Sequence, residues 1–473
     1  MFTLPRLAVA PALGRTASSA LAASLSTAAA ARAGPAVKVD RKKEIQAAKG
    51  RNVVLVDAAR TPFVMAGTDF KPLWSHDLLR KAFKGLLAKT QLDTEHLDYV
   101  IAGNVLQEVK TSNVAREAAL GAGIPDSVPA HTVTMACISS NQALTTGASM
   151  IASGQIDSMI FGGTEVMSDV PIRFSRPLRR LMLDAQKVRS PQGWINLLKR
   201  FRPSMLAPEL PAVAEFSTNE VMGHSADRLA AAFDISREAQ DDFALRSHMN
   251  ALEAGKAGKL SDIVPVYVPG KKEPVVADNG VRITPREKLA SLNPAFVKPH
   301  GTVTAGNASF LTDGASAGLI MSEDKALELG YKPLAYIREY EYVAQDPKDE
   351  LLLGPAYVTP KVLAKAGLTL DDISVFEYHE AFAGQLLANI AALESEWFCK
   401  NKLGLDAAFG SIDMDKLNNW GGSLSIGHPF AATSTRLTYH AAKRLQDADT
   451  KYALTAACAA GGLGSGNVIE RYE

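Results

Sequence analysis

The chain has 473 residues, 47% hydrophobic and 21% charged, so it can bury a large core and is expected to form two or three globular modules of a soluble enzyme. Its 51 Lys and Arg and 50 Asp and Glu leave a net charge of +1, which gives no global argument for a nucleic-acid partner. Cys137, Cys399 and Cys458 form no CxxC pair and no His/Cys cluster at zinc spacing, which argues against a disulfide scaffold and a metal site.

The first 39 residues have the composition of a mitochondrial transit peptide. No acidic residue precedes Asp40, and Ala, Ser and Thr are frequent. The basic residues of this stretch are Arg6, Arg15, Arg32 and Lys38. We expect a transit peptide over residues 1–34, the alternative being a disordered, Ala-rich tail. Beyond it no segment reaches about 18 uninterrupted apolar residues, so we expect no membrane-spanning helix.

The chain then continues as alternating strands and helices. RNVVLVDAARTPF, from residue 51, opens with a continuous apolar run, as in a strand that is buried on both faces. Helical patterns and further strands follow in alternation. This order predicts an α/β fold.

Cys137 lies where a β-branched run gives way to a small-residue helix, in HTVTMACISSNQALTTGASMIASG, residues 131–154. Its sulfur is therefore expected at or inside the first turn of that helix. There the free N–H groups and the helix dipole favour a thiolate, lower the pKa of the thiol and offer amides to an oxyanion. The alternative is an inert, buried residue, so Cys137 needs partners before it counts as a nucleophile.

Residues 168–311 are irregular, rich in Pro and charge, and look like an insertion. The insertion contains a helix, ISREAQDDFALRSHMNALEAG, for which Ser236 is the expected N-cap and Gly255 the expected stop. Its basic segment, residues 173–202, holds nine Lys or Arg and one acid, Asp184. Apolar residues recur there twice at helical spacing: Leu178, Leu181, Met182 and Ala185, then Trp194, Leu197, Leu198 and Phe201. Two short amphipathic helices with basic polar faces are predicted.

The second half echoes the first. LAKAGLTLDDISVFEYHE at 363–380 aligns without a gap with LAKTQLDTEHLDYVIAGN at 87–104, and each copy predicts a helix end, a turn and a strand. We therefore expect two similar halves, the first over 51–167 plus 312–333 and the second over 334–473. The alternative is a chance similarity between two α/β units.

The second half supplies possible partners for Cys137. His379 and Glu380 follow the strand ISVFEY, where a loop at a strand's carboxyl end would carry active-site groups. His428 lies between a glycine and a proline that fix the turn and point the ring outward. Cys458 ends a strand. Each histidine taken alone could simply cap a helix.

These motifs resemble the thiolase family, in the family's order, and the similarity extends over residues 51–473. The motifs are TMACISSNQA around Cys137, HEAF at 379–382, GHPF at 427–430 and CAAGGLG at 458–464. GTVTAGNASFLTDGA at 301–315 resembles the thiolase segment that lines the coenzyme A site. The resemblance implies an α/β thiolase fold, in which two βαβαβαββ halves form a layered α-β-α-β-α core with an inserted loop domain.

The resemblance also implies a two-step cleavage of 3-ketoacyl-CoA of medium or long chain length. Cys137 would attack the 3-keto carbon while His428 holds its sulfur deprotonated, and Cys458 would protonate the departing enolate and later take the proton of coenzyme A. The products would be acetyl-CoA and a shortened acyl-CoA, through an acyl-cysteine intermediate. No metal or bound cofactor is required, because the thioester itself makes the α-carbon a tolerable leaving carbanion. Coenzyme A would be a cosubstrate.

Other roles follow from the same resemblance. His379 and His428 would stabilise the enolate, and the backbone N–H groups of Cys137 and Ala460 the tetrahedral intermediate. Ser309 and Phe382 match positions that line the pantetheine tunnel. Where thiolases usually read GHPxGATG, this chain reads GHPFAATS. Ala431 and Ser434 therefore replace glycines at a helix start and add bulk close to the site.

Two alternative functions remain open at this point. A decarboxylating ketoacyl synthase also uses one Cys and two His, although Cys458 argues against it. A non-catalytic scaffold for a hydratase/dehydrogenase partner is the other. The resemblance implies a homodimer within an α2β2 complex with such an α subunit, and no nucleic acid.

The basic segment suggests a place for the protein on the matrix side of the mitochondrial inner membrane. Helices of this kind lie on anionic lipid, such as a cardiolipin-containing surface. The candidate membrane contacts are Arg179, Arg180, Trp194, Lys199, Arg200 and Phe201. Two alternatives are a solvated face that covers the protein's own core, and docking to a partner subunit or to coenzyme A phosphates.

Overall fold

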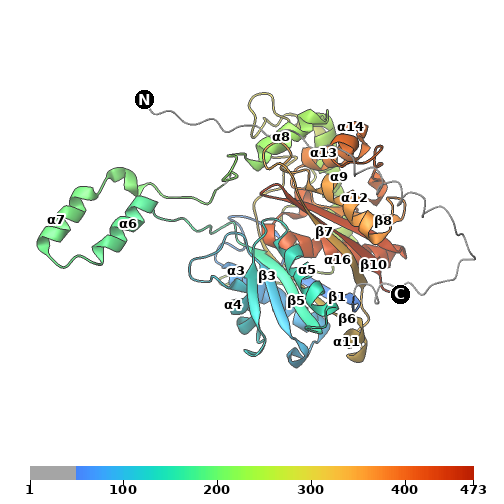
Figure 1. Cartoon of the computed structure of the whole chain (residues 1–473), viewed down its shortest axis with the longest axis horizontal. Coiled ribbons are helices and arrows are strands. Elements are labelled where there is room, and N and C mark those ends of the chain that lie inside the picture. Colours follow the sequence, from blue (N-terminus) through green and yellow to red (C-terminus); the bar gives the residue numbers. More distant parts are fainter. Residues whose placement is uncertain (1–49, 213) are drawn as a thin grey trace, which may run out of the picture. The chain divides into compact units, whose positions relative to one another are not determined.

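The computed structural model describes residues 50–212 and 214–473, along which strands and helices alternate (Figure 1). The predicted transit peptide, residues 1–34, lies outside the described residues. Within the described part of the chain, no helix combines the length and apolar character needed to cross a bilayer.

Among the described residues, the first half supplies six strands, four helices and one 3-10 turn. Its strands are β1 (Val53–Arg60), β2 (Val64–Met65), β3 (Tyr99–Gly103), β4 (Ala130–Val133), β5 (Ser158–Glu165) and β6 (Thr312–Ser322). Its helices are α3 (Ser75–Thr90), α4 (Val114–Ala122), α5 (Ser139–Ala152), α11 (Glu323–Glu328) and the 3-10 turn η1 (Thr94–His96). The apolar run at residue 51 does form a buried strand, β1.

The second half supplies four strands and the helices that cover them. Its strands are β7 (Ala335–Ala344), β8 (Ile373–Tyr378), β9 (Tyr452–Ala459) and β10 (Leu463–Arg471). Its helices are α12 (Gly354–Ala366), α13 (Ala383–Glu394), α14 (Glu396–Asn401), α15 (Ser423–Ile426) and α16 (Thr433–Ala448). Two 3-10 turns, η3 (Met414–Lys416) and η4 (Phe430–Ala432), complete it.

The strand order of the mixed sheet occurs twice. The order is β4-β3-β5-β6-β1 in the first half and β7-β10-β9-β8 in the second, and β2 pairs with β6. Apart from the edge strand β4, the two halves correspond strand by strand: β3-β5-β6-β1 matches β8-β9-β10-β7. In each of these series the first pair is parallel and the next two pairs are antiparallel. The aligned segments 87–104 and 363–380 contain β3 and β8, which hold equivalent places. The predicted pair of similar halves is confirmed.

The helices form layers above, between and below the two halves of the sheet. The halves join where β1 pairs with β7 through two positions, Val54 with Tyr336 and Leu55 with Ala335. Helices α3 and α4 cover the first half on one side, α12 covers the second half, and α5 and α16 pack together between them. One hydrophobic cluster joins Leu144 of α5 and Leu445 of α16 to strands of both halves. The predicted layered α/β core is confirmed.

The insertion leaves the sheet between two neighbouring strands, β5 and β6. Its helices are α6 (Arg176–Ala185), α7 (Pro191–Arg200), α8 (Met222–Ala232), α9 (Arg237–Lys256), α10 (Arg286–Ala290) and the 3-10 turn η2 (Pro203–Leu206). Ser236 caps α9 as predicted, because its hydroxyl accepts the N–H of Ala239. That helix ends one residue beyond the predicted stop, Gly255. The residue boundaries of the predicted parts stay a prediction.

The two amphipathic helices predicted in the basic segment are α6 and α7, which pack against each other as a helical hairpin (Figure 1). Leu181 and Leu197 are buried in the hairpin. The exposed large apolar side chains of the two helices are Met182, Leu183, Trp194, Ile195 and Leu198, followed by Phe201 just past the end of α7. A helix that only covered its own core would bury most of these side chains, so the apolar surface of the hairpin is left open.

Candidate active site

Cys137 lies in a tight turn between β4 and α5. Ala136 adopts a positive φ of 46°, which turns the chain sharply just before the cysteine. The Ser139 hydroxyl fixes this turn, because it accepts the N–H of Met135 at 2.8 Å and donates to the carbonyl of Ala136 at 2.6 Å. The cysteine therefore stands two residues before α5 begins, and it packs beside Ala457 and Ala459 of β9.

Two backbone amides lie close to the thiol of Cys137 and favour its charged form. They belong to Ala460, which follows β9, and to Cys137 itself. Burial nevertheless raises the pKa of this thiol to about 12, and the carboxylate of Glu165 adds to the rise. The expected lowering of this pKa is therefore wrong. The cost of burying the charged form outweighs the effect of the amides, so the site holds a neutral thiol that needs a base.

His428 is positioned by the turn that contains its neighbouring glycine. Gly427 has a φ of 111°, which a residue with a side chain rarely adopts, and the N–H of His428 donates to the Thr312 hydroxyl at 2.9 Å. Nδ1 of the ring lies 2.7 Å from the hydroxyl of Thr433, while Nε2 is buried without a partner in the described structure. Burial, helped by the charge of Arg436, lowers the pKa of His428 to about 3, so its imidazole is neutral.

His379 lies directly beside His428. It follows β8, and its backbone N–H donates to Ala456 of the parallel strand β9 at 2.8 Å. The two ring centroids are 4.2 Å apart. Nδ1 of His379 lies 3.1 Å from the Ser423 hydroxyl, and Nε2 is again buried and unpaired. Burial and the nearby His428 and Arg436 place the pKa of His379 well below its usual value.

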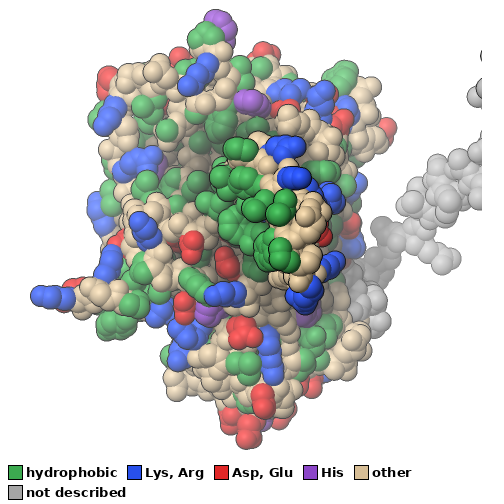
Figure 2. All heavy atoms as spheres, turned by 90° about the vertical axis from the view of Figure 1, so that its left-hand side faces the viewer, with side chains coloured by type: hydrophobic (Ala, Val, Ile, Leu, Met, Phe, Trp, Pro, Cys, Tyr) green, Lys and Arg blue, Asp and Glu red, His purple; other side chains and the backbone are tan. Residues whose placement is uncertain are grey.

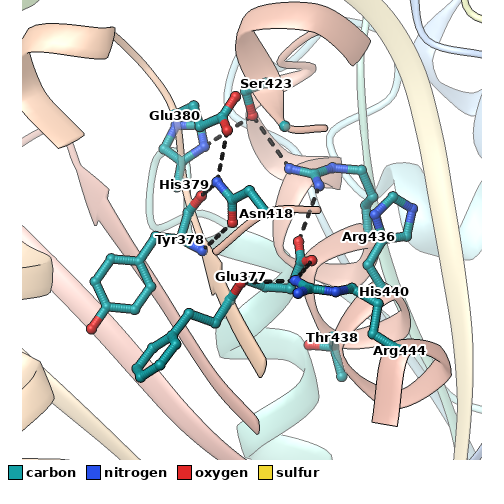
Figure 3. A network of polar contacts seen from close by, with 12 residues as sticks. Glu377, Tyr378, His379, Glu380, Asn418, Ser423, Arg436, Thr438, His440 and Arg444 are labelled. Carbon is teal, nitrogen blue, oxygen red and sulfur yellow. Dashed lines mark hydrogen bonds and ion pairs between the residues drawn. The ribbon is translucent and has the colours of Figure 1, made fainter. Parts of the chain in front are cut away.

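Glu380 supports this loop and does not face the reacting groups. Its carboxylate accepts a hydrogen bond from Ser247 at 2.7 Å. It accepts another from the amide of Asn418 at 2.7 Å (Figure 3). The same Asn418 side chain pairs with the backbone N–H and carbonyl of Tyr378 at the end of β8. Burial raises the pKa of Glu380. Asn418 and Glu380 thus hold the HEAF loop against the turn before α15.

Cys458 is the second thiol of the site, at the penultimate position of β9. It is buried where α12 packs closely on the sheet, because a Cβ on Gly354 at the start of α12 would lie 2.7 Å from the Cα of Gly464 and 3.3 Å from the Cα of Cys458. Burial raises the pKa of this thiol, and Cys137 lies near enough to raise it further. Cys458 therefore keeps its proton in the resting site and can donate it.

The starts of α5 and α16 bring the two halves together at this point. The N–H of Thr435 in α16 donates to the hydroxyl of Ser140 in α5 at 3.2 Å. Glu165 at the end of β5 accepts N–H groups from Leu106 at 2.9 Å and from Ala431 at 3.4 Å. Burial raises the pKa of Glu165 to about 7. Cys137 lies near Cys458, His379 lies beside His428, and these contacts join the segments that carry the two pairs.

The predicted coenzyme A residues lie next to the loop that carries His379. Ser309 donates its backbone N–H to Ala381 at 2.9 Å, and Ala308 forms an isolated bridge with Phe382. The Phe382 ring packs edge-on against Phe296 at 6.0 Å. Ser309 and Phe382 are therefore neighbours, on segments that are 73 positions apart in the numbering.

The remaining predicted groups lie elsewhere or form no site. The candidate membrane contacts are on α6 and α7 and at Arg200 and Phe201, where α7 ends. Cys399 is buried in α14, where its thiol donates to the carbonyl of Leu393 at 3.3 Å. Across residues 50–212 and 214–473, no three His, Cys, Asp or Glu side chains are grouped as metal ligands would be.

Sequence reasoning missed the groups that support the catalytic candidates. They are Ser423, Thr433, Arg436, Glu165 and Glu215, the last of which accepts the N–H of Gly461 at 2.8 Å. Thr433 lies five residues after His428 and Ser423 lies five before it, so their closeness to the GHPF turn was the available signal. Glu215 comes from the insertion, and no local pattern relates it to Cys137.

Two family models together match most of the chain. The model for the N-terminal domain of thiolase matches residues 53–324. The model for the C-terminal domain of thiolase matches residues 331–471.

The chain is also similar to named proteins over most of its length. It is 59% identical over 448 residues to the human "trifunctional enzyme subunit beta, mitochondrial", which covers 95% of this chain and 94% of that protein. It is 60% identical over 422 residues to a "probable 3-ketoacyl-CoA thiolase" of Caenorhabditis elegans, with 89% and 94% covered. The crystal structure of human mitochondrial 3-ketoacyl-CoA thiolase matches at a TM-score of 0.75 and 32% identity, with 89% and 99% covered.

Proposed function

Because the chain belongs to the thiolase family, we propose that it is a 3-ketoacyl-CoA thiolase, an acetyl-CoA C-acyltransferase that cleaves medium- and long-chain 3-ketoacyl-CoA with coenzyme A. The reaction is the last step of mitochondrial fatty-acid β-oxidation. One observation carries the proposal: two neutral imidazoles with buried, unpaired Nε2 atoms lie side by side, and two protonated thiols, Cys137 and Cys458, lie near each other.

The first half-reaction forms an acyl-cysteine and acetyl-CoA. Nε2 of His428 takes the proton of Cys137, and the sulfur attacks the 3-keto carbon of the substrate. The amides of Cys137 and Ala460 stabilise the oxyanion. When the bond between C2 and C3 breaks, its electron pair passes to the thioester as an enolate, whose oxygen faces His379 and His428. Cys458 then gives its proton to C2.

The second half-reaction restores the resting enzyme. The Cys458 thiolate takes the proton of incoming coenzyme A, and the resulting thiolate attacks the acyl group on Cys137. The Cys137 sulfur leaves and recovers its proton from His428. Coenzyme A is thus consumed as a substrate. The proton lent to His428 returns to Cys137, whereas the proton that Cys458 gave to C2 stays in acetyl-CoA and is replaced by the thiol proton of coenzyme A.

Ser309 and Phe382 are proposed to line the pantetheine tunnel. Their segments adjoin through the bridge between Ala308 and Phe382, and the Phe296 ring extends this wall. Apolar walls with few polar groups are the usual lining of ligand pockets. The tunnel would open beside His379, where the thioester oxygen must lie.

A substrate assay separates this function from its two alternatives. The full chain is expected to consume 3-ketohexadecanoyl-CoA, followed by its absorbance, only when coenzyme A is added. A ketoacyl synthase would instead release carbon dioxide from a malonyl thioester. A scaffold subunit would leave the absorbance unchanged, as the Cys137→Ala variant is expected to do.

The two pKa shifts predict an unusual pH profile for Cys137. Neither His428, with a pKa of about 3, nor Cys137, with a pKa of about 12, titrates between pH 5 and 9. Over that range the Cys137 thiol and the His428 imidazole together hold one transferable proton, which His428 can accept when the sulfur reacts. Alkylation of Cys137 by iodoacetamide should therefore be nearly independent of pH. In His428→Ala only the free thiolate reacts, and the rate should rise about tenfold per pH unit. Peptide mass spectrometry locates the label.

A wild-type alkylation rate that rose tenfold per unit over this range would contradict the role of His428. Equal pH profiles for the wild type and the variant would do the same. Cys399→Ala serves as the control, because its thiol is buried in α14 and lies outside the site.

The mitochondrial relative supports a mitochondrial location for this chain. We propose that the chain acts there within a complex. The human relative is named as a mitochondrial subunit beta, which supports assembly with an α subunit. We propose the finer arrangement, a homodimer within an α2β2 complex with a hydratase/dehydrogenase, on the matrix side of the inner membrane. Sedimentation of the chain with and without such a subunit tests it.

The hairpin of α6 and α7 is proposed as the contact with an anionic membrane. Its apolar side chains are exposed, and Figure 2, taken from the hairpin's side, shows hydrophobic side chains gathered with Lys and Arg around them. Arg179 pairs with Glu209 and Arg200 with Asp184, whereas Arg180 and Lys199 are exposed. Apolar contacts and basic charge together are what attach a helix to an anionic surface.

Charge reversal tests this contact. Each basic residue near an anionic surface contributes about 1 kcal/mol, so changing four to Glu should abolish flotation with cardiolipin-containing vesicles. The four are Arg179, Arg180, Lys199 and Arg200. The matched control reverses four exposed basic residues outside the hairpin: Lys256, Arg286, Lys400 and Lys451. Unchanged flotation of the hairpin variant, or equal loss in the control, would contradict the proposal.

A further inference from the structure

Each of the two imidazoles is held through Nδ1 by a hydroxyl, and each leaves Nε2 unpaired and buried. The hydroxyl on His428 is that of Thr433, at 2.7 Å, and the hydroxyl on His379 is that of Ser423, at 3.1 Å. A neutral imidazole carries one proton, on either nitrogen, so the hydroxyl at Nδ1 decides what Nε2 can do. The two hydroxyls have different second partners.

The Thr433 hydroxyl has a backbone carbonyl as its second partner. It donates to Pro429 at 3.2 Å, one helical turn earlier. Its single hydrogen is then used, so its oxygen must accept from His428, and the proton of that ring sits on Nδ1. Nε2 of His428 therefore presents a lone pair, which is what a base for Cys137 requires.

The Ser423 hydroxyl has a guanidinium as its second partner. Arg436 is fully buried and donates to the Ser423 oxygen at 3.4 Å, and Figure 3 shows the serine standing between this arginine and His379. A guanidinium can only donate, so the hydrogen of the Ser423 hydroxyl stays available, and Nδ1 of His379 is the partner in the described structure that can accept it. The proton of His379 then sits on Nε2, which presents an N–H.

We propose that Thr433 and Ser423 are positioning residues that hold His428 and His379 in opposite tautomers, so that one Nε2 accepts a proton while the other donates a hydrogen bond. This inference rests on the proposed function. Arg436 acts through Ser423. None of the three touches the reacting atoms.

The opposite tautomers would favour the enolate over the ground state. Before Cys137 loses its proton, only His379 can donate to the thioester oxygen. Once the proton has moved from the sulfur to Nε2 of His428, both rings present an N–H to the same oxygen. The second donor therefore appears only as negative charge develops there, which is the condition for stabilising a transition state beyond its substrate.

Histidine nitrogen shifts test the tautomers directly. The full chain is labelled with 15N-histidine, and the signals of the two rings are assigned by their loss in His428→Asn and His379→Asn. We expect a protonated Nδ1 in His428 and a protonated Nε2 in His379. The same tautomer in both rings would overturn the inference.

Hydroxyl removal tests the consequence with two separate readouts. Thr433→Val should slow iodoacetamide labelling of Cys137 at pH 7 at least about tenfold and make it rise with pH, because His428 loses its lone pair at Nε2. Ser423→Ala should leave that labelling unchanged and slow deuterium exchange at C2 of acetyl-CoA by a similar factor. Thr433→Ser should restore the wild-type profile.

The control and the remaining outcomes keep the two proposals apart. Thr438→Val removes another buried hydroxyl of α16, one that donates to Ser434 and not to a histidine, and should leave both rates unchanged. If both site variants lowered both rates together, their role would be merely structural and the inference would fail. If wild-type protein did not cleave 3-ketoacyl-CoA at all, the proposed function would fail first.

Discussion

Cys137→Ala is expected to lower kcat for thiolysis by about 10⁴-fold or more, because it removes the nucleophile that lies beside the backbone amides of Cys137 and Ala460. No other group in the site can form the acyl intermediate, since Cys458 stands on β9 without those amides as partners. The loss should appear in kcat with little change in the affinity for coenzyme A. Steady-state assays with 3-ketohexadecanoyl-CoA measure the first quantity and isothermal titration the second.

Cys399→Ala is the matched control for this change. It removes a buried thiol outside the site, from α14, whose partners are backbone groups of Leu393 and Phe409. It should keep wild-type kcat even if the protein melts at a lower temperature. Residual thiolysis within tenfold of wild type in Cys137→Ala would contradict its role as nucleophile.

Cys458→Ala is expected to lower thiolysis by about 10²- to 10⁴-fold, the usual contribution of a positioned acid or base. The variant cannot protonate the enolate at C2, nor take the proton of coenzyme A. Burial holds the pKa of this thiol above its usual value, so wild-type Cys458 stays protonated until the enolate forms. Rapid mixing with 3-ketoacyl-CoA should show slow release of acetyl-CoA.

The partial reactions separate Cys458 from Cys137. Iodoacetamide should still label Cys137 in Cys458→Ala, because the base for that thiol is His428. Cys458→Ser should remain nearly as slow as Cys458→Ala, since a hydroxyl is a far weaker acid than a thiol. Wild-type cleavage by Cys458→Ala would remove this residue from the mechanism.

The architecture could be predicted because it is repeated in the chain. Segments 87–104 and 363–380 keep the same order of helix end, turn and strand, and β3 and β8 occupy equivalent places in the sheet. Local pattern also located α6, α7 and the N-cap Ser236. The four candidate catalytic residues could be named because each stands in a short motif at the end of a strand or the start of a helix.

The electrostatics of the site could not be predicted in the same way. A helix start suggests a lowered pKa for Cys137, yet burial and Glu165 decide it, and both depend on segments distant in the sequence. The hydroxyls on the two histidines raise a similar difficulty. Ser423 and Thr433 are near His428 in sequence, but Ser423 binds His379, which only the folded chain brings within reach. Joining the halves through β1 and β7 likewise depends on long-range pairing.

Trapping the acyl intermediate is the most direct test of the account. The full chain is mixed with 3-ketohexadecanoyl-CoA in the absence of free coenzyme A, quenched in acid and digested, and the added mass is located by peptide sequencing. We expect a tetradecanoyl group on Cys137 that disappears when coenzyme A is added before the quench. An acyl group on Cys458 or Cys399 in its place, or active protein that never carries one, would contradict the account.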